Sequence, residues 1–209
     1  MNGLEQELLQ EVDWRTNELS IIRTIPILCN CNDKQKEILE KYSVVAIYSI
    51  WEGFVTQSFT LYIREINNFK LSYEKINLNI LTYDIFIKYG LTEEQIKHFE
   101  HKCKFVNNIF EYSKLPVMIS SNIPTESNVN FKVINKILKH FHLEELPAND
   151  FERRLNKLLK YRNNIAHGEF SLPVTKEIIQ DFNSTVIDSM HEVTIRIIEG
   201  VINKKYLRF

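Results

Sequence analysis

An arginine, an asparagine and a histidine lie close together in the segment LLKYRNNIAHGEF, residues 158–170: Arg162, Asn163 and His167. Histidine transfers protons near neutral pH, and arginine stabilises negative charge that develops on phosphoryl oxygens. These residue types suit cleavage of an RNA phosphodiester, because the 2′-hydroxyl of RNA is its own nucleophile and no metal ion is then required. An arginine shortly before a histidine occurs often by chance, so the pattern alone is weak evidence for a functional site. The helix that positions the two residues must therefore be considered.

That helix is predicted over residues 151–167, preceded by Pro147 and Asp150 and stopped by Gly168. At about 100° per residue, Arg162 falls in the middle of the apolar face, whereas Asn163 and His167 share an adjoining polar stripe. An unpaired buried guanidinium is costly, so Arg162 must have a partner or line a groove. The apolar face comprises Phe151, Leu155, Leu158, Leu159, Ile165 and Ala166.

A second helix, predicted from a cap at Asp33 to about residue 67, is apolar nearly all round and should be central. Its segment 42–63 has the length of a membrane span, but Glu52 lies near the middle, where a carboxylate is strongly disfavoured. The sequence therefore predicts a buried core helix and no membrane partner.

Glu52 is the natural candidate partner for Arg162, because it is the single carboxylate of residues 42–63. Two alternatives stay open. Glu52 could point to solvent or bond to Ser49 and Thr56, and an Arg162–Glu52 pair could be a purely structural ion pair.

The remaining patterns predict an all-α fold, an antiparallel helical bundle of about five main helices in one domain, residues 1–209. An N-terminal helix should end near Pro26, a helix should cover about residues 129–142, and Pro173 should open a long final helix. Residues 68–127 read as an insertion of short helices, one of them starting at the capping box of Thr92 and Gln95.

Charge excludes a strong general attraction to nucleic acid, because 26 basic and 27 acidic side chains give a net charge of −1. Any RNA contact must be local. The candidates lie on the helix of Arg162, although a solvated charged face explains them equally well: Arg153, Arg154, Lys157 and Lys160.

Three cysteines without framework spacing, and an acidic N-terminus without an apolar leader, favour a cytoplasmic protein. His98 and His101 with Cys103 could ligate a metal, but no fourth ligand is evident. We expect no metal site and no cofactor.

The segment around Arg162 and His167 resembles the signature of HEPN (higher eukaryotes and prokaryotes nucleotide-binding) domains, an Arg-x4–6-His motif that often begins Arg-Asn. The run VVAIYSIWEGFV, residues 44–55, resembles the YxxWEGF pattern in the second helix of one bacterial branch, whose motif continues as IAHGE. Residues 127–141 resemble the helix that precedes the motif in that branch. The resemblance covers most of the chain outside residues 68–127.

The resemblance implies a metal-independent endoribonuclease, homodimeric, serving as a toxin or an antiphage-defence effector. Arg162 would stabilise the phosphorane, His167 would act as general base or acid, and Asn163 would position the phosphate or the histidine. The products would be a 2′,3′-cyclic phosphate and a 5′-hydroxyl. Besides RNA, the implied partners are a second copy and an antitoxin or defence-system protein.

Two points of the family pattern leave alternatives open. Some family toxins are silenced by AMPylation of a tyrosine two residues after the histidine, where this chain has Glu169. Other HEPN domains bind nucleotides or proteins without catalysis, so a non-catalytic binding module is the alternative function.

Overall fold

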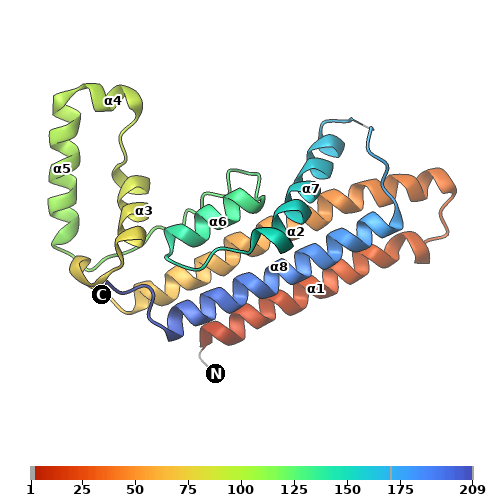
Figure 1. Ribbon diagram of the computed structural model, residues 1–209, viewed down its shortest axis with the longest axis horizontal. Helices are drawn as coiled ribbons and strands as arrows, with labels where there is room; N and C mark the ends of the chain where they lie inside the picture. The colour runs from red at the N-terminus through yellow and green to blue at the C-terminus, as the bar shows by residue number, and fades with distance from the viewer. Residues whose placement is uncertain (1–2, 170, 209) are drawn as a thin grey trace.

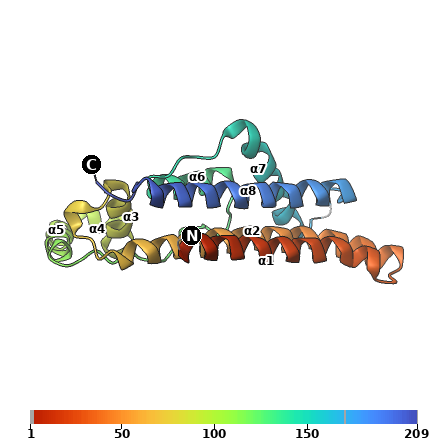
Figure 2. The same cartoon turned by 90° about the horizontal axis from the view of Figure 1, so that it is seen from below.

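Three long helices run side by side along the molecule in the computed structural model, which describes residues 3–169 and 171–208. They are α1 (Gly3–Leu28), α2 (Asp33–Asn68) and α8 (Lys176–Ile202). Figures 1 and 2 show that α2 and α8 run in one direction and α1 in the other. Within the described ranges the only β-type pairing is an isolated bridge between Ile76 and Leu207. The predicted all-α helical bundle is confirmed.

Helix α2 is the centre of the bundle and contacts α1, α7 (Ala148–Ala166) and α8. Its aromatic residues Trp51, Phe54 and Phe59 are completely buried, as the apolar sequence predicts. None of the helices within residues 3–169 and 171–208 is long and apolar enough to cross a membrane. The side chain that caps α2 is Asn32 rather than Asp33, and Asn32 forms a capping box with Gln35.

Two side chains of α2, Trp51 and Tyr48, form hydrogen bonds with the backbone of Val129. Trp51 donates its indole N–H to the carbonyl oxygen of Val129 at 3.0 Å, and the Val129 N–H donates to the Tyr48 hydroxyl at 2.6 Å. Val129 lies two residues before α6 (Phe131–His140), whose inward residues are those expected from the sequence. They are Val133, Ile134, Ile137 and Leu138.

The other helix boundaries differ from the sequence expectation by a few residues. Helix α1 continues past Pro26 to Leu28. Helix α8 begins after Thr175 rather than at Pro173, because the Thr175 hydroxyl accepts a hydrogen bond from the Ile178 N–H at 3.4 Å and so caps the helix. Helix α7 ends one residue before His167, in agreement with the stop signal at Gly168.

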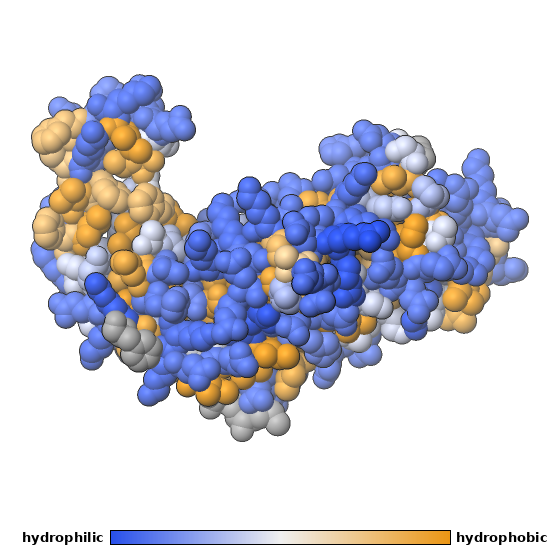
Figure 3. All heavy atoms as spheres, viewed as in Figure 1, coloured by the Kyte–Doolittle hydropathy of each residue, from blue (hydrophilic) through white to orange (hydrophobic). Residues whose placement is uncertain are grey.

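Helices α3 (Leu78–Tyr89), α4 (Glu93–Lys97) and α5 (Phe99–Ser113) form an arm that stands off one end of the bundle (Figure 1). The Thr92–Gln95 capping box is present, but the single helix expected there is broken at His98, whose backbone is extended. Helix α3 packs against α6. The arm exposes apolar side chains on α5, which colour it orange in Figure 3: Phe99, Val106 and Phe110.

Asp84 holds the arm together from a fully buried position on α3. Its carboxylate accepts hydrogen bonds from the Tyr112 hydroxyl on α5, from the Lys88 ammonium at 2.7 Å and from the Ser120 N–H at 2.6 Å. Helix α3, helix α5 and the loop that contains Ser120 therefore meet at the Asp84 carboxylate.

Replacing Asp84 by Asn should lower the free energy of unfolding by about 2–4 kcal/mol, because the buried Tyr112 hydroxyl and the Ser120 N–H lose a carboxylate acceptor, an amide NH2 faces these donors, and Lys88 loses its counter-ion. Urea denaturation followed by circular dichroism measures the change. Glu94→Gln is the matched control, since the exposed Glu94–Lys97 pair of the same arm should contribute under about 1 kcal/mol. Equal effects of the two substitutions would contradict the role assigned to Asp84.

Candidate functional site

The C-terminal end of α7 is closed by a regular backbone motif that fixes the place of His167. Gly168 has a φ of +74°, its N–H donates to the Ile165 carbonyl at 3.1 Å, and the Glu169 N–H donates to the Asn164 carbonyl at 2.9 Å. This pair of bonds is a Schellman motif, which favours glycine at its left-handed position. His167 is therefore the C-cap of α7, and its side chain is exposed.

Arg162 lies one and a half turns earlier, on the side of α7 that faces α2. Its guanidinium lies 4.7 Å from the centre of the buried Tyr48 ring, in a cation–π contact. The side chain is half-buried, and no carboxylate within residues 3–169 and 171–208 lies within 4.0 Å of it. The sequence predicts that Arg162 has a partner or lines a groove, and the structure gives it a partner, the face of the Tyr48 ring.

The expected ion pair between Arg162 and Glu52 is not formed. Glu52 is half-buried on α2, and neither of its neighbouring hydroxyl groups bonds to its carboxylate: Thr56 donates to the Glu52 backbone carbonyl, and Ser49 donates to that of Val45. Arg162 finds its contact one helical turn away from Glu52, at Tyr48. Sequence patterning places the right helices together, but it does not choose between a carboxylate and a π face.

Burial and two charged groups, the Glu52 carboxylate and the Arg162 guanidinium, shift the pKa of Tyr48. Burial raises the pKa of Tyr48 to about 12, and the negative charge of Glu52 adds to this rise, whereas the Val129 N–H and the Arg162 guanidinium oppose it. The phenol is therefore neutral at physiological pH and serves as a hydrogen-bond acceptor and as a ring surface. Sequence reasoning missed Tyr48 as a site residue, although it is the tyrosine of the YxxWEGF pattern.

Asn163 connects the two ends of the site. Its side-chain carbonyl accepts a hydrogen bond from Arg162 Nη1 at 2.8 Å, and its backbone carbonyl accepts one from the His167 N–H at 3.0 Å. The first bond orients the amide so that its NH2 group is left to donate elsewhere. Arg162, Asn163 and the backbone of His167 thus form one bonded unit.

The four basic residues expected to contact RNA divide into two pairs. Arg154 forms an ion pair with Asp188 at 2.7 Å, and Lys157 forms one with Asp181 at 2.9 Å, so both attach α7 to α8. Arg153 and Lys160 are exposed and have no carboxylate within 4.0 Å in the described part of the chain. The solvated-face interpretation is therefore too simple for Arg154 and Lys157.

The loop after α7 is fixed by Asn164, which sequence reasoning did not single out. Asn164 donates from Nδ2 to the Glu169 carboxylate at 2.8 Å and to the Ser171 hydroxyl at 3.1 Å. The Glu169 side chain therefore supports the end of the helix. Of the apolar face predicted for α7, Ala166 is exposed, because the helix end leaves the bundle there.

The candidate metal ligands are not arranged around a common point. The rings of His98 and His101 meet edge to face with centroids 5.9 Å apart, and His98 lies 3.7 Å from Glu94. No group of three His, Cys, Asp or Glu side chains suited to hold a metal ion occurs among the residues that the structure describes.

Comparison with known proteins gives a family for nearly the whole chain. The model of the HEPN_MAE_28990-like HEPN family matches residues 4–206, a range that includes α2, the arm and α7. No curated protein and no solved structure matches the chain. Because the match spans the bundle and the Arg162–His167 segment together, the chain belongs to the HEPN family.

Proposed function

We propose that this HEPN protein is a metal-independent endoribonuclease that cleaves RNA by attack of the 2′-hydroxyl on the adjacent phosphate. The observation that carries the proposal is the state of Arg162. Its guanidinium is half-buried, packed on Tyr48 and free of any carboxylate within 4.0 Å in the described residues. A guanidinium that no carboxylate neutralises keeps its charge for an incoming phosphate.

The bonded unit of α7 supplies the groups that such a reaction uses. Arg162 stabilises the charge that develops on the phosphoryl oxygens, and the Asn163 NH2 group donates to the same phosphate. His167, exposed at the end of the helix, takes the proton of the 2′-hydroxyl or gives one to the 5′-oxygen. The products are a 2′,3′-cyclic phosphate and a 5′-hydroxyl.

One histidine cannot stand on both sides of the phosphate at once. The reaction needs a base at the 2′-oxygen and an acid at the 5′-oxygen, and each chain supplies one His167. A homodimer that brings two α7 ends to one cleft provides both, so we propose a composite site in a homodimer. Arg153 and Lys160, which have no carboxylate partner in the described part of the chain, contact the RNA backbone beside it.

The biological role that follows is a toxin or antiphage-defence effector, restrained by a partner protein. The support for this role is membership of the HEPN family. The alternative, a non-catalytic module that binds a nucleotide or a protein, draws support from the neutralisation of Arg154 and Lys157 by Asp188 and Asp181, which weakens the basic face. Assays of RNA cleavage separate the two functions.

Arg162→Ala and His167→Ala should each lower RNA cleavage by about 10²-fold or more, because each removes a charge-stabilising or proton-transferring group. The rate is measured on labelled RNA in EDTA, where the wild type should remain active and leave a 2′,3′-cyclic phosphate. His191→Ala, an exposed histidine on α8, should cleave at the wild-type rate. Equal activity of all variants removes the mechanism, and loss of wild-type activity in EDTA indicates a metal enzyme.

Tyr48→Phe and Tyr48→Leu should separate the ring from the hydroxyl. Phe keeps the ring under Arg162 but loses the acceptor for the Val129 N–H, so stability should fall by about 1–3 kcal/mol while the rate per folded molecule is retained. Leu loses the ring as well, and the rate per folded molecule should fall several-fold. Thermal melting gives the folded fraction. Equal catalytic losses in both variants would refute the role of the ring.

Arg153→Ala combined with Lys160→Ala should weaken binding of single-stranded RNA and flatten its salt dependence. Two lost phosphate contacts should lower the slope of log K against log salt by about 1.4, at about 0.7 for each contact. Fluorescence anisotropy at several salt concentrations measures the slope. Lys102→Ala with Lys104→Ala, two exposed lysines of the arm, is the control that should leave it unchanged.

A further inference from the structure

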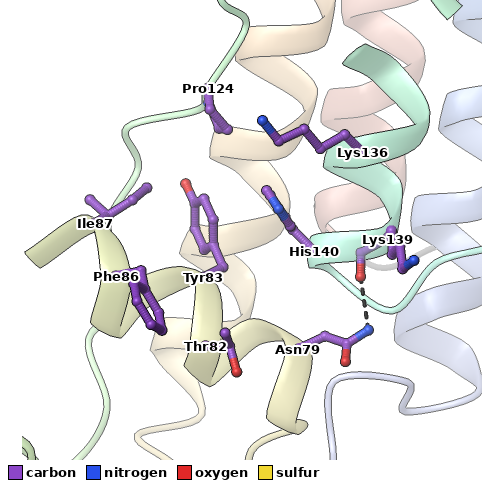
Figure 4. A pocket seen from close by; sticks show the side chains of 9 residues that line it. All are labelled: Asn79, Thr82, Tyr83, Phe86, Ile87, Pro124, Lys136, Lys139 and His140. Atoms are coloured by element: carbon purple, nitrogen blue, oxygen red, sulfur yellow. Dashed lines mark hydrogen bonds between the residues drawn. The ribbon is translucent and has the colours of Figure 1, made fainter. Parts of the chain in front are cut away.

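A cavity of about 510 Å³ lies between helix α3 of the arm and helix α6 of the bundle (Figure 4), and neither Arg162 nor His167 is among the residues that line it. Its volume falls in the range of about 300–1,000 Å³ that is usual for sites of small organic ligands. Residues of α3 line one side, residues of α6 line the other, and Pro124 of the loop between α5 and α6 also contributes to the lining.

The two sides of the cavity differ in chemistry. Tyr83, Phe86 and Ile87 of α3 present ring and aliphatic surface, together with Pro124. Helix α6 presents two lysines and a histidine, Lys136, Lys139 and His140. The only carboxylate paired with them among the described residues is Glu126, which lies 2.7 Å from Lys136 and is half exposed. The cavity is therefore apolar on one wall and cationic on the other.

His140 is the one buried polar group of the cavity that lacks a partner. The residue is partly buried, and its ring lies 5.5 Å from the Tyr83 ring, tilted by 32°. Its Nδ1 atom is shielded from solvent and has no hydrogen-bond partner in the described part of the chain. Burial and the nearby Lys136 ammonium lower the pKa of His140.

Lys136 and Lys139 make the α6 side of the cavity positively charged. An anionic group beside Lys136 would meet that charge and would offset the ammonium that lowers the pKa of His140. A flat apolar body would lie against Tyr83 and Phe86. These requirements describe a ring that carries one negative group.

We propose that the cavity between α3 and α6 binds a small aromatic carboxylate, with its ring on the Tyr83–Phe86 wall and its carboxylate at Lys136, beside His140. The site is separate from the proposed ribonuclease site and does not depend on it. Arg162→Ala should therefore leave binding at the cavity unchanged, whatever the outcome of the cleavage assays.

The test uses 2-naphthoate as the probe and 2-naphthalenemethanol as its neutral analogue, each titrated into the full chain by isothermal titration calorimetry. The carboxylate should bind with one site per chain and at least tenfold more tightly than the alcohol. Lys136→Gln should weaken the carboxylate about tenfold or more, because a charge-assisted hydrogen bond is lost. Lys132→Gln, an exposed lysine on α6 that does not line the cavity, should bind as the wild type does.

A second variant guards against a loss of binding through misfolding. Thr82 is exposed at the cavity and Thr82→Trp should occlude it without touching the core, so it should abolish binding while leaving the melting temperature unchanged. In the wild type, the probe should shift the imidazole nitrogen signals of His140 in NMR spectra. The proposal is overturned by equal affinity for the two probes, by absence of binding at millimolar concentration, by binding that survives Thr82→Trp, or by His140 signals that do not move.

Discussion

The phenol of Tyr48 is the group on which the site and the middle of the bundle both depend. Its oxygen accepts the Val129 N–H at 2.6 Å, and its ring carries the Arg162 guanidinium at 4.7 Å. One side chain of α2 thus contacts both the residue that leads into α6 and the face of α7 that carries Arg162. Trp51, one turn away, binds the other polar group of Val129, so the backbone of that residue is satisfied from a single helix.

Much of the fold could be predicted from sequence, because burial follows the helical period wherever a helix packs on one side. The inward residues of α6, the apolar character of α2 and the stop at Gly168 are examples. The break at His98 was not visible, since a single residue in extended conformation leaves no mark on periodicity. The sequence predicts the start of α8 at Pro173 for a similar reason, because Pro173 and Thr175 are both ordinary start signals and only the Thr175 hydroxyl accepts a hydrogen bond from a helical N–H.

The site was harder to predict, since its contacts join residues that are distant in sequence. An arginine on an apolar face implies a partner, but the identity of the partner depends on the rotation and height of α2 against α7, which place Tyr48 rather than Glu52 under the guanidinium. The same limit applies to Arg154 and Lys157. A row of basic residues on a helix has the same sequence pattern whether it faces water or faces the aspartates of α8. Which of the two holds depends on how α7 and α8 are aligned along each other.

Because His167 is the C-cap of α7, the hydrogen bonds that hold it in place are local and do not involve the core of the bundle. Its backbone is held by hydrogen bonds to Asn163 and Ile165 and by the loop that Asn164 secures, and none of these bonds reaches the aromatic interior. Terminal helical turns open with a much smaller free energy than whole domains. Opening of this last turn would therefore move His167 while α2, α8 and the rest of α7 stayed folded.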